Sequence, residues 1–260
     1  MGSGNTLRIL VANTLSTSLN DVIGEVSFVI WLCGCNFKCP YCQNWPLVID
    51  KGGICVAKDV DNLINEIEQV RTYIGYVQVT GGEPTLQGDA VQALFSRVKK
   101  IGLNTSLDTN GSHPQVINTL IGCQLLDHLA VDVKARLEPY AYSKVVGLPM
   151  DITKMYLKRI LNSLELASKL DFVEIRTTYV PSLLTQEDII EIADMLSSYL
   201  TKKKHFYVIQ QFVPNENAPD PRFRRGPLPS VEELLSIARK VADRLPNVAI
   251  RHIGGVDYIE

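Results

Sequence analysis

The chain has 260 residues, of which 46% are hydrophobic and 21% are charged, a composition typical of a globular protein. Its 26 Lys and Arg against 28 Asp and Glu give a formal net charge of −2, which provides no overall attraction to nucleic acid or to an anionic membrane. No apolar run reaches the ~18 residues of a transmembrane helix, and no secretory signal is present, so we expect a cytoplasmic protein without a membrane partner. The opening Met1–Thr6 formally fits a myristoylation pattern, which we interpret as a chance match or a cloning scar.

Strand-like and helix-like segments alternate along the chain. In chain order we expect a strand at 26–32, a helix at 58–73, a strand at 76–80, a helix at 89–101, a strand at 104–108, a helix at 114–122, a strand at 126–133, a helix at 154–169, a strand at 172–180, a helix at 186–200, a strand at 206–213, a helix at 231–245 and a strand at 248–253. This alternation predicts an α/β fold, a partial (β/α)6-type barrel of parallel strands with functional loops at the strands' carboxyl ends. We expect a single domain, 1–260, with an irregular Pro- and Arg-rich loop at about 215–229.

Four of the six cysteines fall within ten residues, too close together for a disulfide framework. Cys35, Cys39 and Cys42 have C-x₃-C-x₂-C spacing after an expected strand, so they could bind three irons of a cubane cluster and leave the fourth iron open. The alternative is a zinc site, which needs a fourth ligand such as Cys33 or a distant Cys or His.

The loop from Cys35 to Cys42 resembles the signature of the radical S-adenosylmethionine (SAM) superfamily. The resemblance implies a [4Fe–4S] cluster whose open iron is chelated by the amino and carboxylate groups of SAM, with Tyr41 near the adenine. We interpret Cys33 as lining the cluster pocket, and Cys55 and Cys123 as small buried core residues.

Gly81-Gly82-Glu83-Pro84 follows another expected strand. Two glycines let the backbone approach a ligand closely, and the Glu83 carboxylate could accept hydrogen bonds from an ammonium group. Taken alone, the segment could be a simple turn. Next to the cysteine loop it resembles the superfamily motif that holds the SAM amino group.

Two further segments resemble parts of the glycyl-radical-enzyme activases: Asp108-Thr109-Asn110-Gly111 and Asp132-Val133-Lys134. The resemblance implies that these residues contact the SAM ribose and carboxylate, or bind a monovalent cation near Asp108 and Asp132. Arg176 resembles a strand-borne arginine that faces SAM. The structural alternatives are an Asn-Gly turn, a surface Asp–Lys pair and an arginine paired with an acid.

The resemblance implies that an electron cleaves SAM to methionine and a 5′-deoxyadenosyl radical, which abstracts a hydrogen atom from a substrate; no general base is assigned. The anaerobic ribonucleotide reductase activator-like and pyruvate formate-lyase activase-like proteins are the nearest branches. They imply a glycyl radical enzyme as partner and a flavodoxin- or ferredoxin-like electron donor. Two family features lack a match: a Gly-rich stretch, here 18–24, and a late histidine, near 211–215.

Two other functions stay open. Lys202–Lys204 and Arg222–Arg225 could contact phosphates in a radical SAM enzyme that modifies RNA, or the substrate could be a small molecule. The net charge favours a solvated helix end and a structural loop for these basic segments. The remaining alternative is an iron–sulfur or zinc protein without catalysis.

Overall fold

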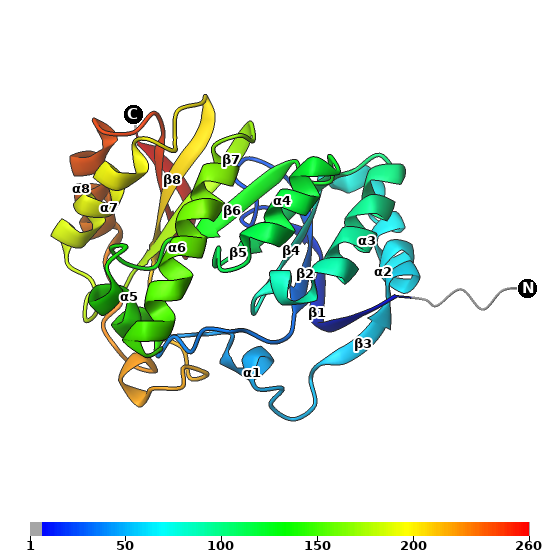
Figure 1. The fold of residues 1–260 in the computed structure, drawn as a ribbon, viewed down its shortest axis with the longest axis horizontal. Helices are drawn as coiled ribbons and strands as arrows, with labels where there is room; N and C mark the ends of the chain where they lie inside the picture. Colours follow the sequence, from blue (N-terminus) through cyan, green and yellow to red (C-terminus); the bar gives the residue numbers. More distant parts are fainter. Residues whose placement is uncertain (1–6, 260) are drawn as a thin grey trace, which may run out of the picture. The chain divides into compact units, whose positions relative to one another are not determined.

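The computed structural model describes residues 7–259, so the pattern at Met1–Thr6 lies outside the described residues (Figure 1). The chain groups into two compact units. The first contains the described residues up to Cys35 together with 46–108 and 115–128, and the second contains 36–45, 109–114 and the described residues from 129 onward. Within 7–259, no helix combines the length and the apolar character that a membrane crossing requires.

The first unit is built on a sheet in the strand order β5-β4-β2-β1-β3. Its elements are β1 (Arg8–Ser18), β2 (Ser27–Leu32), β3 (Val56–Asp59), α2 (Val60–Glu68), the 3₁₀ helix η1 (Arg71–Tyr73), β4 (Tyr76–Gly81), the 3₁₀ helix η2 (Pro84–Gln87), α3 (Gly88–Lys100), β5 (Asn104–Thr109) and α4 (Pro114–Gly122). Strands β2, β4 and β5 run parallel, with Val77 opposite both Phe28 and Thr105, whereas β1 pairs antiparallel with β2 and β3. The short helix α1 (Trp45–Val48) precedes β3.

The second unit is built on a sheet in the strand order β10-β9-β8-β7-β6. Its elements are β6 (His128–Asp132), α5 (Pro139–Val146), α6 (Met150–Ala167), β7 (Phe172–Tyr179), α7 (Gln186–Leu196), β8 (Lys204–Gln211), the 3₁₀ helix η3 (Pro221–Phe223), α8 (Val231–Ala242), β9 (Val248–His252) and β10 (Gly255–Ile259). Strands β7, β8 and β9 run parallel, and β10 returns antiparallel to β9. Thr185 and Asp188 bond reciprocally at the start of α7, which explains where that helix begins.

The mixed α/β class and the mostly parallel strands confirm the sequence prediction, and every predicted strand is present, as β2 and β4–β9. The helix expected at 58–73 was wrong at both ends, because Lys58 and Asp59 pair with β1 as part of β3 and α2 already ends at Glu68. The antiparallel strands β1, β3 and β10 and the helices α1 and α5 were not predicted. In β1 the apolar Ile9 and Val11 are buried beside exposed residues, so the segment lacks the continuous apolar run of the parallel strands. The single domain stays a prediction.

Candidate functional site

The loop that carries Cys39 and Cys42 belongs to the second unit and is held against the end of α5. Lys38 N donates to Val146 O (2.9 Å), and Cys42 N donates to Cys39 O (3.1 Å). After α5, Gly147 has a φ of +66°, and a Cβ there would lie 2.1 Å from the Lys38 carbonyl oxygen. Only glycine therefore lets α5 approach the loop this closely.

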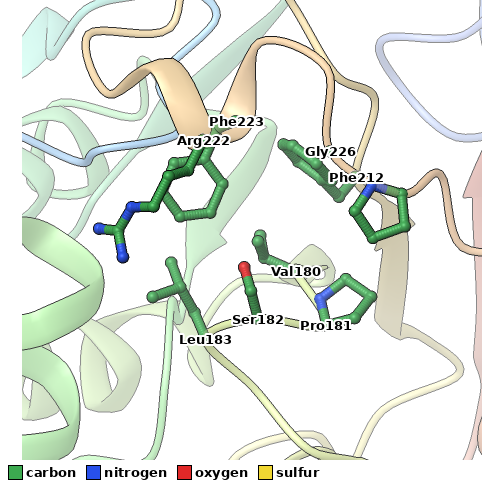
Figure 2. A pocket seen from close by; sticks show the side chains of 9 residues that line it. Val180, Pro181, Ser182, Leu183, Phe212, Arg222, Phe223 and Gly226 are labelled. Atoms are coloured by element: carbon green, nitrogen blue, oxygen red, sulfur yellow. The ribbon is translucent and has the colours of Figure 1, made fainter.

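Tyr41, next to Cys42, is positioned by aromatic packing. Its ring makes edge-on contacts with Phe212 (6.3 Å between centroids) and Phe223 (6.2 Å). The same two rings line a cavity of about 110 Å³, together with residues 180–183 after β7 (Figure 2). Burial raises the pKa of Tyr41 well above its ordinary value, so the phenol stays protonated. Tyr41 is therefore a fixed, neutral ring at the cysteine loop.

A charged triad lies where β6 ends. Asp132 is the last residue of β6, Lys134 follows that strand, and Arg176 lies in β7. Lys134 Nζ donates to Asp132 Oδ2 (2.9 Å), and Arg176 Nε donates to Asp132 Oδ1 (3.3 Å). Burial by itself would raise the pKa of Asp132, but the two cations outweigh it and hold the pKa below its ordinary value. Asp132 thus holds two cationic side chains, and cations of this kind can pair with an anionic group such as a carboxylate.

Lys134 also acts on the cysteine loop. Burial raises the pKa of Cys42, and the positive charge of Lys134 opposes this effect. The backbone N–H of Lys134 donates to the hydroxyl of Tyr142 (3.3 Å), a fully buried residue of α5. Sequence analysis missed Tyr142, because no motif marks it. The second unit therefore brings two predicted residues, Lys134 and Cys42, together and supports Lys134 from α5.

A ring of hydrogen bonds joins the cysteine loop to the turn after β5. Asn110 Nδ2 donates to Asn36 Oδ1 (2.9 Å), Asn36 Nδ2 donates to Ser112 Oγ (2.9 Å), and Ser112 N donates to Asn110 Oδ1 (3.0 Å). Nearby, the buried Thr109 hydroxyl accepts from Gly111 N (3.1 Å). Asn110, expected to contact SAM, thus has its amide group engaged with the loop that carries the cysteines.

In the first unit, two backbone segments lie in direct contact. Glu83 N donates to Gly34 O (2.8 Å), and Gly82 N donates to Leu32 O (2.9 Å). A Cβ on Gly82 would lie 1.9 Å from Gly34 O, and a Cβ on Gly81, where φ is +117°, would lie 2.4 Å from Leu32 O. The two glycines are therefore required for the end of β4 to approach the segment that leads into the cysteine loop.

Glu83 is fully buried, and its side chain caps η2. Its Oε1 accepts hydrogen bonds from Thr85 N (3.0 Å) and from the Thr85 hydroxyl. Glu83 thus has a local structural role beside the ligand role expected from the sequence. Asp108, the other carboxylate expected to bind SAM or a cation in this unit, lies partly buried near the end of β5.

The cysteines outside the C-x₃-C-x₂-C motif correct the sequence interpretation. Cys33 and Cys55 form a disulfide, so Cys33 is not a free thiol, and Cys55 is half-buried rather than a core residue. Cys123 is free but exposed, so its assignment to the core was also wrong. The register of β1 with both β2 and β3 brings Cys33 and Cys55 together, which sequence spacing does not reveal.

The chemistry of the three cysteines suits an iron–sulfur cluster. Cys35, Cys39 and Cys42 are not joined in a disulfide, and three cysteines match a cluster with one open iron. Among residues 7–259, no three His, Cys, Asp or Glu side chains gather in the structure as a site for a metal ion. The predicted site residues of the first unit are Cys35, Gly81, Gly82, Glu83 and Asp108, and those of the second are Cys39, Tyr41, Cys42, Thr109, Asn110, Asp132, Lys134 and Arg176.

The two basic segments make local bonds. Lys202 Nζ donates to the carbonyl oxygens of Lys169 (2.7 Å) and Leu170 (2.8 Å). Arg222 pairs with Asp220 at 2.6 Å. These contacts favour the structural interpretation of both segments over a phosphate-binding one.

Comparison with known proteins gives the family. Residues 29–197 match the family model described as the radical SAM superfamily. A protein of Methanocaldococcus jannaschii, provisionally named a glycyl-radical enzyme activating enzyme, is 37% identical over 251 residues, which is 96% of this chain and 98% of that protein. The pyruvate formate-lyase 1-activating enzyme of Escherichia coli is 30% identical over 144 residues, or 53% of this chain and 56% of that enzyme.

Solved structures show the same fold at low sequence identity. The FeFe-hydrogenase maturase of Carboxydothermus hydrogenoformans is 14% identical with a TM-score of 0.60, over 84% of this chain and 50% of that one. A domain of pyruvate-formate lyase-activating enzyme from Bacteroides vulgatus is 17% identical with a TM-score of 0.51, over 68% of this chain and 98% of that one. Since the family model matches more than half of the chain and the Methanocaldococcus protein matches nearly all of it, the chain belongs to the radical SAM superfamily.

Proposed function

We propose that this radical SAM enzyme activates a glycyl radical enzyme by taking a hydrogen atom from a glycine Cα of that partner. The observation that carries the proposal is the near full-length match to a relative named for this activity. When bound, the [4Fe–4S] cluster and SAM would supply an electron and a 5′-deoxyadenosyl radical, and the chain would supply ligands, orientation and exclusion of water.

In this proposal Cys35, Cys39 and Cys42 each bind one iron. The fixed ring of Tyr41 supports a position near the adenine, and the charged triad of Asp132, Lys134 and Arg176 suits the SAM carboxylate. Each Asp132 oxygen accepts from one of the two cations, which holds Lys134 and Arg176 in place for such a contact. The Gly81–Glu83 segment would hold the SAM amino group, and its two glycines let the segment lie against the backbone of Leu32 and Gly34, just before the cysteine loop.

The proposal includes a monovalent cation near Asp108 and Asp132. Asp108 lies near the carboxyl end of the parallel strand β5 and Asp132 lies at the carboxyl end of β6, and ligand-binding groups of α/β folds gather at such strand ends. Titrating SAM in potassium and in tetramethylammonium buffers of equal ionic strength tests it, and equal affinities would contradict it.

The proposal also includes a flavodoxin- or ferredoxin-like electron donor and a cytoplasmic location, which suit an oxygen-sensitive cluster. The donor is tested by replacing dithionite with a reduced flavodoxin or ferredoxin and measuring 5′-deoxyadenosine. Its formation at a rate that saturates with donor concentration is the expected result.

The activity is tested with reduced protein, SAM and a glycyl radical enzyme from the same source, followed by electron paramagnetic resonance (EPR). A glycine-centred doublet, together with one 5′-deoxyadenosine per radical, is the expected result. Cleavage of SAM without a glycyl signal would contradict the partner and leave a small molecule or RNA as substrate. A cluster that never cleaves SAM would contradict the enzymatic proposal as a whole.

A further inference from the structure

A group of cationic side chains lies beside the loop that carries Cys39 and Cys42, within the second unit. The loop is held to the end of α5, where Val146 O accepts from Lys38 N (2.9 Å), and to α6, where the ring of Phe37 lies 5.4 Å from that of Tyr156. In Figure 1 this loop, in blue, passes the ends of α5 and α6. The cations of the loop and of these two helices, four exposed lysines and a half-buried arginine, are called the basic surface here: Lys38, Lys144, Lys154, Lys158 and Arg159.

The basic surface has almost no counter-charge. The segments 36–45 and 139–159 contain its five cations and one carboxylate, Asp151, in a chain whose formal net charge is −2. Among residues 7–259, none of the five cations takes part in an ion pair; the side chains of Lys144 and Arg159 instead lie over tyrosine rings, at 4.0 Å and 5.5 Å from the centroids. Lys154 and Lys158 are four residues apart on α6, a spacing at which like charges destabilise a helix. An anionic partner from outside this part of the chain would relieve that repulsion.

Exposed apolar side chains accompany the cations on the same two helices. Tyr140 of α5 and Met150, Ile152 and Met155 of α6 are between 39% and 63% exposed. Tyrosine, methionine and arginine are enriched in protein–protein interfaces. A surface that binds only phosphate groups gains nothing from exposed methionine and isoleucine side chains. The mixture of cations and apolar groups therefore favours an acidic protein over a nucleic acid as the partner.

We infer that the basic surface docks an acidic one-electron donor protein that reduces the cluster. The inference rests on the proposed function, which needs one electron from outside the chain for each SAM that is cleaved. Lys38 directly precedes Cys39, so a protein seated on Lys38 lies beside the loop that carries two of the proposed cluster ligands. Electron transfer slows steeply with distance, and this placement keeps the distance short. The donor loses one electron and the cluster gains it, and no atom is exchanged.

A small, charged surface of this kind suits a short-lived complex. Electron-transfer complexes are at the low end of interface size, because the oxidised donor must leave before a reduced one can bind. Charges at the rim of an interface steer the two proteins together and make their association sensitive to salt. Loss of the basic surface should therefore change the Michaelis constant for the donor and its salt dependence, and leave SAM binding unchanged.

Two charge-reversal variants test the inference. Lys154→Glu/Lys158→Glu reverses two exposed lysines of α6 and leaves the cysteine loop untouched. Lys100→Glu/Lys169→Glu is the control, because it changes the net charge equally at exposed lysines outside the basic surface. Each protein is reconstituted anaerobically and supplied with SAM and either a reduced flavodoxin of acidic surface or dithionite. The rate of 5′-deoxyadenosine formation is measured against flavodoxin concentration at low and at high salt.

We expect Lys154→Glu/Lys158→Glu to raise the Michaelis constant for flavodoxin about tenfold or more at low salt. Its rate with dithionite should equal that of the wild type, which shows that the fold, the cluster and SAM binding are intact. The control variant should stay within about twofold of the wild type in both assays. High salt should bring the wild type close to Lys154→Glu/Lys158→Glu, because it screens the attraction. Equal Michaelis constants for the two variants would overturn the inference.

Further assays identify a different occupant of the basic surface. With dithionite as reductant, glycyl radical formation is measured against the concentration of a glycyl radical enzyme. If Lys154→Glu/Lys158→Glu raises the Michaelis constant for that enzyme but not for flavodoxin, the surface docks the glycyl radical enzyme and the inference is overturned. Single-stranded RNA that binds the wild type but not this variant, with flavodoxin kinetics unchanged, would overturn it as well. If the wild type cleaves SAM but forms no glycyl radical, the proposed function fails, while the flavodoxin assay still decides the docking surface.

Discussion

At the scale of single residues, Asp132 positions two cationic side chains, those of Lys134 and Arg176. Each of its oxygens accepts from one cation, Lys134 or Arg176, and the Arg176 side chain is only 6% exposed. Without the carboxylate, a nearly buried guanidinium would lose its paired charge, which is costly in a low-dielectric environment. Asp132 therefore serves stability as well as the ligand-binding role proposed for it.

We expect Asp132→Asn to lower the free energy of unfolding of the apoprotein by about 1–3 kcal/mol at pH 7, less than for a fully buried pair because Asp132 is 31% exposed. Chemical denaturation measures this. Asp171→Asn, whose carboxylate is 96% exposed beside Lys202, is the control and should change stability by less than about 0.5 kcal/mol. Equal stability of Asp132→Asn and the wild type would contradict a stabilising triad.

The difference in the free energy of unfolding between the wild type and Asp132→Asn should depend on pH. Because the pKa of Asp132 is lowered in the folded protein, its charge stabilises the fold above its unfolded pKa near 4, and this contribution is lost as the pH falls through the lowered pKa. The stability difference between the wild type and Asp132→Asn should therefore stay constant from pH 7 to about pH 5 and shrink below about pH 4. A difference that grows on acidification would have the wrong sign.

Asn36 and Asn110 should act as one unit. Asn36→Ala and Asn110→Ala are each expected to lower the free energy of unfolding by about 1 kcal/mol, because each breaks the same ring of hydrogen bonds. The double variant should lose about 0.5–1 kcal/mol less than the sum of the two. Reconstituted variants should also release iron to a chelator faster, and strictly additive losses would show that the ring is not cooperative.

Replacement of Cys35, Cys39 or Cys42 by Ala should abolish the cluster, since three thiolates are the minimum for this ligation. Cys123→Ala should retain it. Iron and sulfide content and the visible absorption spectrum provide the measurement. A full cluster in any of the three loop variants would contradict the ligand assignment.

At the scale of elements, the end of β4 is defined by backbone contact. The glycines at 81 and 82 let this strand end lie against the segment between β2 and the cysteine loop, where Gly34 O accepts from Glu83 N. A side chain there would have to displace backbone rather than a flexible group, so the contact cannot be restored by a small rotation.

Gly82→Ala should therefore lower the free energy of unfolding by about 2–4 kcal/mol and weaken SAM binding, because its Cβ would lie 1.9 Å from Gly34 O. Gly122→Ala is the matched control: it lies in α4 with no atom within 4 Å of its Cβ position, and should stabilise by about 0.5–1 kcal/mol. Thermal unfolding of the apoproteins and SAM titration of the reconstituted ones measure both effects. If the two variants behave alike, the close approach is not required.

At the scale of the whole molecule, the disulfide crosslinks two positions 22 residues apart, on either side of the cysteine loop. The chain-entropy model predicts that Cys33→Ser/Cys55→Ser lowers the free energy of unfolding of the oxidised apoprotein by about 3 kcal/mol. Adding dithiothreitol should bring the wild type down to the level of the variant. A difference that persists under reducing conditions would show that the two serines, rather than the lost crosslink, destabilise the fold.

Much of the proposed chemistry was already determined by the sequence. The three proposed cluster ligands come from one short loop, and the two glycines at 81 and 82 come from a single turn, so local spacing was enough to suggest the radical SAM family. The alternation of parallel strands and helices was likewise predictable, because the sequence of a buried parallel strand is a continuous apolar run. Elements that are buried on one side only, such as β1, were missed for the same reason.

Contacts between distant segments were decided only by the tertiary structure. The pairing of Cys33 with Cys55 depends on the register of β1 with two other strands, and the joining of Asn36 to Asn110 depends on where the turn after β5 lies. Sequence spacing carries no information about such partners, because they are chosen by strand order and by side-chain packing. The sequence thus determined which cysteines are candidates to bind a cluster, and the fold decided which two cysteines form a disulfide.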